Sequence, residues 1–335
     1  MFLPREYTTD DFNKLVVSDD FIILTSNIDE PRSNRLIELY PQTKRIEIDY
    51  SVDMGENNIL KDSFKIQTNF DCSYDGKTYD SLYNDLRMFV KELCLPITRK
   101  LLIDISSLHL RFLGALLATI SEFTWEAVFC SYTETTSYPR SREAVPFGNK
   151  SFDHKAGFDL NSSFWGYDEI PNLKTITSER DNYVWIAFLG FEGKRTSAVY
   201  TEISDDANVI IPVITTPSVK PGWANYAFEA NQILFENGAM CCADIQYTDA
   251  LDPFATYNFI ENIEIQYPNK HLVISPLGTK PVSLGVLLYA LLHEESEVYF
   301  DTPKNSCFIT LNAGKVHFYD ILSFIEESNK DIERI

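Results

Sequence analysis

The chain has 335 residues, of which 44% are hydrophobic and 23% are charged, and its formal net charge at pH 7 is −20. This length and composition are typical of a globular protein with two domains of about 150 residues each. The acidic charge argues against sequence-independent DNA binding, which depends on lysine and arginine against phosphate, so we expect no nucleic-acid partner. The chain shows no signal-peptide pattern, and no apolar run reaches the roughly 18 residues of a membrane span. We expect a cytoplasmic protein without membrane contact.

The cysteines and histidines indicate no metal site. The six cysteines form no C-x-x-C pair, and the adjacent Cys241 and Cys242 cannot easily adopt ordinary disulfide geometry. The five histidines lie far apart in the sequence, without metal-ligand spacing. We therefore expect reduced thiols, no metal and no required cofactor.

In the first half, apolar runs predict buried strands and leucines at helical spacing predict helices. The predicted order is strand 21–26, helix 31–40, strand 46–49, a polar loop 51–78 with one or two short strands, helix 79–95, strand 101–105, helix 108–123 and strand 127–131.

The second half repeats this alternation after a segment rich in Ser, Thr, Pro and Asn. The predicted order is strand 184–189, helix 196–203, strand 209–214, helix 223–236, strand 240–245, helix 253–267, strand 271–275, helix 283–293 and strand 297–300. Asp252 before Pro253 is the expected cap and first-turn pair of its helix. The tail predicts a hairpin, residues 308–311 with 315–319 around Asn312-Ala313-Gly314, followed by a short acidic helix.

Two blocks of the second half match blocks of the first. Residues 101–117 match 272–288 without a gap (Gly285 minus Gly114 gives 171), and a second match relates Arg32 to Arg195 (a difference of 163). Apolar strands that alternate with helices indicate a parallel sheet covered on both faces. The sequence therefore predicts an α/β protein of two tandem Rossmann-like domains with mainly parallel sheets, related by internal duplication. We expect a degenerate copy at 1–135, an ordered linker at 136–181, and a second domain with the hairpin and helix at 182–335.

One loop of the second half has the features of an anion site. Ser275 ends a strand, Gly278 would let the main chain approach a ligand, and Lys280 adds positive charge. Thr279 is a plausible N-cap whose hydroxyl would accept a main-chain N–H. Free N–H groups at a positive helix end bind anions. The alternative is a well-capped helix with Lys280 in solvent.

A second loop also follows a strand and opens a helix. Gly190 and Gly193 permit unusual main-chain angles, Arg195 is suited to hold phosphate, and Glu192 is suited to accept from a ribose hydroxyl. The matching loop of the first half keeps the arginine, as Arg32, without the glycines. An arginine kept in both copies also fits the alternative that it pairs with an acid in each.

These loops lie at carboxyl ends of strands, where open parallel sheets bind ligands. The sequence places residues 215–217 and Asp244 at the same edge, and Trp223 either covers the crevice or belongs to the core. The first half has Ser107 and His109 where the second has the glycine and lysine, so we expect its site to be degenerate.

The strand, glycine-threonine-lysine turn and helix at 275–288 resemble the ligand loop of CARF-type domains, Rossmann-like sensors of cyclic oligonucleotides in prokaryotic defence. The resemblance covers this loop and implies that Ser275, Gly278, Thr279 and Lys280 face a nucleotide. CARF domains usually pair across a homodimer and carry an effector domain, whereas this chain holds two unequal copies and no recognisable nuclease.

The leading hypothesis is a sensor of a small phosphorylated or nucleotide-like ligand that regulates a protein partner in a prokaryotic defence or signalling system. Residues 278–280 would hold the anion, with Arg195 opposing and Glu192 reading a hydroxyl. One alternative is a nucleotide or sugar-phosphate hydrolase or transferase with Glu192 or Asp244 as the acid/base. Another is a non-catalytic assembly subunit of a multiprotein complex. A protein partner or homo-oligomer is expected for the sensor and the subunit.

Overall fold

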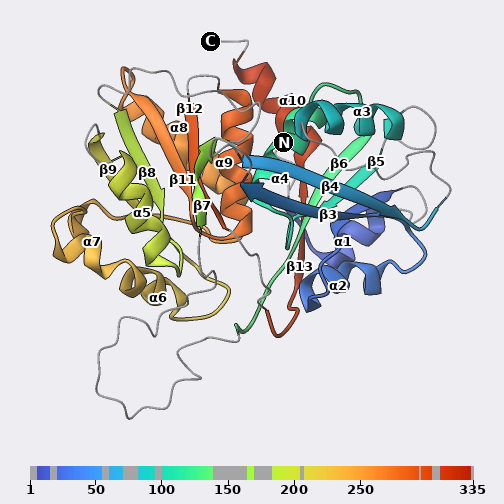
Figure 1. Ribbon diagram of the computed structural model, residues 1–335, viewed down its shortest axis with the longest axis horizontal. Helices are drawn as coiled ribbons and strands as arrows, with labels where there is room; N and C mark the ends of the chain where they lie inside the picture. Colours follow the sequence, from blue (N-terminus) through green and yellow to red (C-terminus); the bar gives the residue numbers. More distant parts are fainter. Residues whose placement is uncertain are drawn as a thin grey trace. The chain divides into compact units, whose positions relative to one another are not determined.

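The computed structural model describes residues 6–15, 21–54, 60–70, 82–94, 100–138, 164–169, 183–203, 207–293, 296–303 and 310–332. The chain divides into two compact units, residues 1–136 with 310–335 and residues 137–309 (Figure 1). Both units are built on a largely parallel sheet, so the predicted α/β class is confirmed. Within these ranges, every helix is too short or too polar to cross a membrane.

The described strands of the first unit form a mixed seven-stranded sheet in the order β1-β13-β6-β5-β2-β3-β4. In chain order its elements are β1 (Glu6–Tyr7), α1 (Thr9–Leu15), β2 (Ile22–Ser26), α2 (Pro31–Leu39), β3 (Lys44–Met54), β4 (Leu60–Thr68), α3 (Leu82–Cys94), β5 (Lys100–Asp104), α4 (Leu110–Ile120), β6 (Ala127–Thr133), β13 (Val316–Asp320) and α10 (Ile321–Ile332). β3, β2, β5 and β6 run parallel, with Ile22 opposite both Lys44 and Leu101. β4, β13 and β1 each run antiparallel to their neighbours.

Apolar side chains cover both faces of this sheet. On one face, Phe12 of α1 and Leu36 of α2 pack with Ile23 and Leu102, and Phe12 stacks on Phe318 with ring centroids 4.0 Å apart. On the other face, Phe112 of α4 contacts Phe64 of β4 at 5.6 Å between centroids. The further buried side chains of that face include Leu24, Ile46 and Ile103. The in-register strands place these residues side by side.

The described strands of the second unit form a six-stranded sheet in the order β10-β9-β8-β11-β12-β7, parallel except for β7. Its elements are β7 (Phe164–Glu169), β8 (Tyr183–Phe188), α5 (Gly193–Ile203), β9 (Ala207–Thr215), α6 (Trp223–Ala230), α7 (Gln232–Glu236), β10 (Gln246–Thr248), α8 (Pro253–Gln266), β11 (His271–Pro276), α9 (Lys280–Leu292) and β12 (Ser296–Pro303). Trp185 of β8 packs with Val199 of α5 and Leu234 of α7 on one face. Phe188 contacts Phe259 of α8 on the other face. Helices therefore cover both faces.

Three predicted elements differ from the structure. The predicted strand 240–245 is wrong, because Cys242–Asp244 forms a 3-10 turn and β10 begins at Gln246. The predicted helix 223–236 is two helices, α6 and α7, that meet at Asn231. A short strand was among the expectations for 51–78, and β4 is present there but longer than expected, with nine residues.

Two segments pair with strands that the expected domain limits do not assign to them. The tail was expected with the second half, but β13 lies between β6 and β1 of the first unit. Of the predicted first strand of the hairpin, Thr310 and Leu311 lie outside any strand, and residues 308–309 lie outside the described residues. Part of the predicted linker is β7, which pairs antiparallel with β12.

Candidate functional site

The sheet of the second unit has a point at which its connections diverge. β8 and β11 are parallel neighbours, with Phe188 opposite Pro276. β8 continues through α5 to β9 on one side of this pair, and β11 continues through α9 to β12 on the other side. Open α/β sheets bind ligands at this position, outside the carboxyl ends of the two strands. The structure thus brings together the predicted loops at 190–195 and 275–280.

Both glycines of the first loop are required by packing. A Cβ at Gly190 would overlap the carbonyl oxygen of Leu277, so the two loops touch through their main chains. A Cβ at Gly193 would overlap the carbonyl oxygen of Ala230 at the end of α6. Asn231 holds this arrangement, because its Nδ2 donates to the Gly190 carbonyl at 2.9 Å. The glycines therefore have a structural role whether or not a ligand binds.

Arg195 pairs with an acid in its own loop. Its Nη1 lies 3.1 Å from Glu192 Oε2, and the two side chains are 18% and 9% exposed. In the first unit, Arg32 Nη2 lies 2.9 Å from Glu30 Oε1 in the corresponding loop. The alternative that the recurring arginine pairs with an acid in each copy is therefore confirmed. Any ligand contact by Glu192 or Arg195 would compete with their mutual ion pair.

Two residues of the other loop have partners within the protein. Ser275 is fully buried, and its Oγ accepts a hydrogen bond from Trp185 Nε1 at 2.9 Å. Thr279 occupies the N-cap position of α9, but its hydroxyl donates to the Ala250 carbonyl at 2.6 Å. The predicted capping bond of Thr279 is therefore wrong. Its hydroxyl links the start of α9 to the segment before α8 instead.

Gly278 and Lys280 are half-buried at the end of this loop. A Cβ at Gly278 would meet Val282 Cγ1 at 3.7 Å, an ordinary contact, so packing does not require this glycine. Lys280 is the first residue of α9, where the positive helix end disfavours a cation. Lys194 is the second residue of α5, which begins at Gly193. The first turns of α5 and α9, both fully described, contain cations and no acidic residue.

An aromatic cluster that the sequence did not predict lies beside the first loop. Phe191 contacts Trp223 at 5.5 Å and Tyr138 at 5.9 Å between ring centroids, and Trp223 is 7% exposed. Trp223 therefore packs in a cluster that includes a residue of the loop itself. Asp244 lies in an exposed turn before β10, and β9 separates β10 from β8. The structure does not bring Asp244 next to the β8–β11 pair.

The equivalent point of the first unit, between β2 and β5, holds a buried polar network. The carboxylate of Asp104 accepts hydrogen bonds from Thr25 Oγ1 at 3.2 Å, from Ser106 Oγ at 2.6 Å and from Ser106 N at 3.0 Å. Burial raises the pKa of Asp104 to about 6, although these hydrogen bonds lower it. Ser33 and Ser107 hydroxyls contact each other across the two loops. Side chains of the protein thus fill the position between β2 and β5 that corresponds to the carboxyl ends of β8 and β11.

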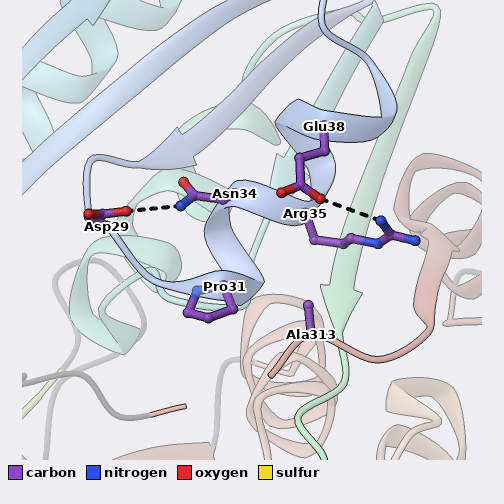
Figure 2. Close-up of a pocket in the computed structure, with 6 residues that line it drawn as sticks. All are labelled: Asp29, Pro31, Asn34, Arg35, Glu38 and Ala313. Carbon is purple, nitrogen blue, oxygen red and sulfur yellow. Dashed lines mark hydrogen bonds and ion pairs between the residues drawn. The ribbon is translucent and has the colours of Figure 1, made fainter. Parts of the chain in front are cut away.

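A cavity of about 550 Å³ lies at the start of α2 in the same unit (Figure 2). Its lining residues are Asp29, Pro31, Asn34, Arg35, Glu38 and Ala313. Asn34 Nδ2 donates to Asp29 at 2.9 Å, and Arg35 lies 3.4 Å from Glu38. The lining holds two carboxylates and one guanidinium, so this cavity does not favour an anion.

No protein-family model matches the chain, and no curated protein matches it. In the described part of the chain, no three His, Cys, Asp or Glu side chains are grouped to hold a metal ion.

Proposed function

We propose that the protein is a sensor of a small anionic, nucleotide-like ligand that binds at the carboxyl ends of β8 and β11. The observation that carries this proposal is the pair of cationic first turns, with Lys194 and Lys280, at the starts of α5 and α9. Positive helix ends and ammonium groups both attract anions. An anion bound between the two first turns would therefore interact favourably with both helix ends and with the charges of Lys194 and Lys280.

The residues around this point have defined roles in the proposal. Lys280 and the main chain at Gly278 hold the anionic group, and Thr279 keeps the start of α9 in place through Ala250. Arg195 neutralises the charge of Glu192 through their ion pair. Glu192 therefore repels an anionic ligand less than it would without Arg195. Phe191 offers the edge of an aromatic cluster beside the loop, suited to a planar base.

The wider hypothesis is a cytoplasmic receptor in prokaryotic defence or signalling, similar to CARF-type domains, that acts on a protein partner. Four parallel strands have the same spatial order relative to the chain order in both sheets, β3-β2-β5-β6 in the first and β9-β8-β11-β12 in the second. This likeness supports an internal duplication. The buried network around Asp104 supports a first copy whose own site is closed. The enzyme alternative is less supported, because Glu192 is paired and Asp244 lies away from the β8–β11 pair.

Calorimetric titration of the full-length protein with adenosine nucleotides, cyclic oligoadenylates and inorganic phosphate tests the proposal. Lys280→Ala should weaken the binding of the best probe by roughly ten- to hundredfold, as expected for a lost charged hydrogen bond of about 1.5–3 kcal/mol. Gly278→Ala should fold normally, because its Cβ has room, yet weaken binding by blocking main-chain approach. Lys270→Ala is the matched control, since it precedes β11 at the opposite end of that strand. Failure of every probe to bind, or equal affinity for Lys280→Ala and Lys270→Ala, would contradict the proposal.

A further inference from the structure

The sheet of the first unit ends in a long strand at its edge. Among the described strands, β4 is the last of its sheet and pairs with β3 alone (Figure 1). It has nine residues, whereas β1 at the other edge has two. Its register with β3 is continuous, and it contains no proline. β4 therefore lacks the short length, the bulges and the prolines with which proteins usually protect an edge strand.

The hydrogen bonds around β3 show which residues of β4 point away from the sheet. Asn69 N, just beyond β4, donates to the Arg45 carbonyl, and Asn27 N, just beyond β2, donates to the Ile48 carbonyl. Odd-numbered residues of β3 thus bond toward β4, and even-numbered residues bond toward β2. Because bonding alternates along an antiparallel pair, the odd-numbered residues of β4 bond to β3. The residues that direct their main-chain N–H and C=O groups to the outer edge include Leu60, Asp62, Ile66 and Thr68.

The solvent-facing side of β4 is a ladder without excess charge. Its side chains are Lys61, Ser63, Lys65 and Gln67. Each lysine lies opposite an aspartate of β3, Asp53 for Lys61 and Asp49 for Lys65. Opposite charges in cross-strand pairs offset each other, so this face does not select a strongly acidic or basic peptide.

We propose that β4 is a dimer interface, at which the β4 strands of two copies of this chain pair antiparallel around a two-fold axis at Phe64. A two-fold axis brings the same strand of both copies together. Leu60 of one copy then lies opposite Thr68 of the other, and Asp62 lies opposite Ile66. The outward main-chain groups of these residues bond across the axis, and the two sheets join into one.

The side-chain charges select this register. With the axis at Phe64, Lys61 lies opposite Gln67 of the other copy, and Lys65 lies opposite Ser63. Moving the axis by one residue sets Lys61 opposite Lys65 on one side, or the two Lys65 side chains opposite each other on the other side. Like charges directly opposite each other are destabilising. Axes further from the centre leave outward groups at one end of β4 without a bonding partner in the other copy.

Sedimentation equilibrium of the full-length protein over a range of concentrations tests the interface. The wild type should be a dimer in equilibrium with its monomer. Ile66→Pro should be monomeric, because it removes an outward N–H and its ring occupies the place of the second strand. The bonds of β4 to β3 come from odd-numbered residues, so this variant should keep its fold, which far-UV circular dichroism checks.

The charge at residue 67 tests the register without a change in the main chain. Gln67→Lys should weaken the dimer and Gln67→Glu should strengthen it, each by roughly two- to thirtyfold in the dissociation constant, because every dimer contains two pairs of residue 67 with Lys61. Gln266→Lys and Gln266→Glu are the matched controls. They change the net charge equally at an exposed position of α8 in the other unit, so they should leave the dissociation constant unchanged.

A wild type that is monomeric at every concentration would overturn the proposal. A dimer that persists in Ile66→Pro would place the interface elsewhere and overturn it as well. Equal dissociation constants for the two Gln67 variants, or equal effects at residues 67 and 266, would refute the pairing around Phe64.

Discussion

Replacing Gly285 with alanine tests how closely α9 packs on α8. A Cβ at Gly285 would overlap the Pro253 carbonyl oxygen and lie 2.7 Å from Thr256 Cβ, whereas carbon atoms pack at about 3.5–4.0 Å. In an exposed helix this change stabilises by about 1 kcal/mol, because glycine is a poor helix former. Overpacking of a buried site costs about 1–3 kcal/mol. We expect a cost in the upper part of this range at Gly285, because neither obstructing atom can rotate away. The difference predicts a net destabilisation of about 1–2 kcal/mol.

Urea unfolding followed by far-UV circular dichroism and tryptophan fluorescence measures this difference. Gly278→Ala is the matched control, because its Cβ meets Val282 Cγ1 at 3.7 Å, and it should stay within about 0.5 kcal/mol of the wild type. If Gly285→Ala is as stable as the wild type or more stable, helix propensity outweighs packing and the argument for close contact between α8 and α9 fails.

Two further predictions concern charged groups of the first unit. His317 lies 2.7 Å from Glu6 and 2.8 Å from Glu134; burial alone would lower its pKa, but these hydrogen bonds raise it overall. Its stabilisation is therefore complete below the unfolded pKa of about 6.5 and is lost as pH rises through the raised folded pKa. The stability difference between wild type and His317→Gln should shrink as the pH rises from about 6.5 through the raised folded pKa of His317. A difference that stays constant with pH would count against the ion pairs. Asp62→Ala should destabilise the unit by about 3–5 kcal/mol in urea unfolding, because Asp62 lies 2.7 Å from Arg111 and both are buried; Asp62→Ala/Arg111→Met should recover part of this loss, and equal stability of the two variants would refute the reasoning.

Elements whose signals lie within a few consecutive residues were predicted well. The apolar run at 21–26 forms β2, and the helical spacing at 253–267 forms α8. Asp252 caps α8 as expected, because its Oδ1 accepts from the N–H groups of Phe254 and Ala255.

Pairing between distant segments was not predicted. β13 joins β6 although nearly two hundred residues separate them, and β7 joins β12 from within the expected linker. Strand pairing depends on main-chain hydrogen bonds and on burial against partners elsewhere in the chain. Neither leaves a local pattern, so the tail could not be assigned to its unit from periodicity.

The sequence by itself determined that two loops with glycines and cations end strands and begin helices, because turn residues, caps and apolar periodicity act over short stretches of chain. Only the tertiary structure decided what their side chains do. The sheet order places β8 beside β11, so Gly190 meets Leu277. The same packing directs the Thr279 hydroxyl to Ala250. A polar group inside a fold takes the nearest available partner, and which partner is nearest depends on how distant segments pack.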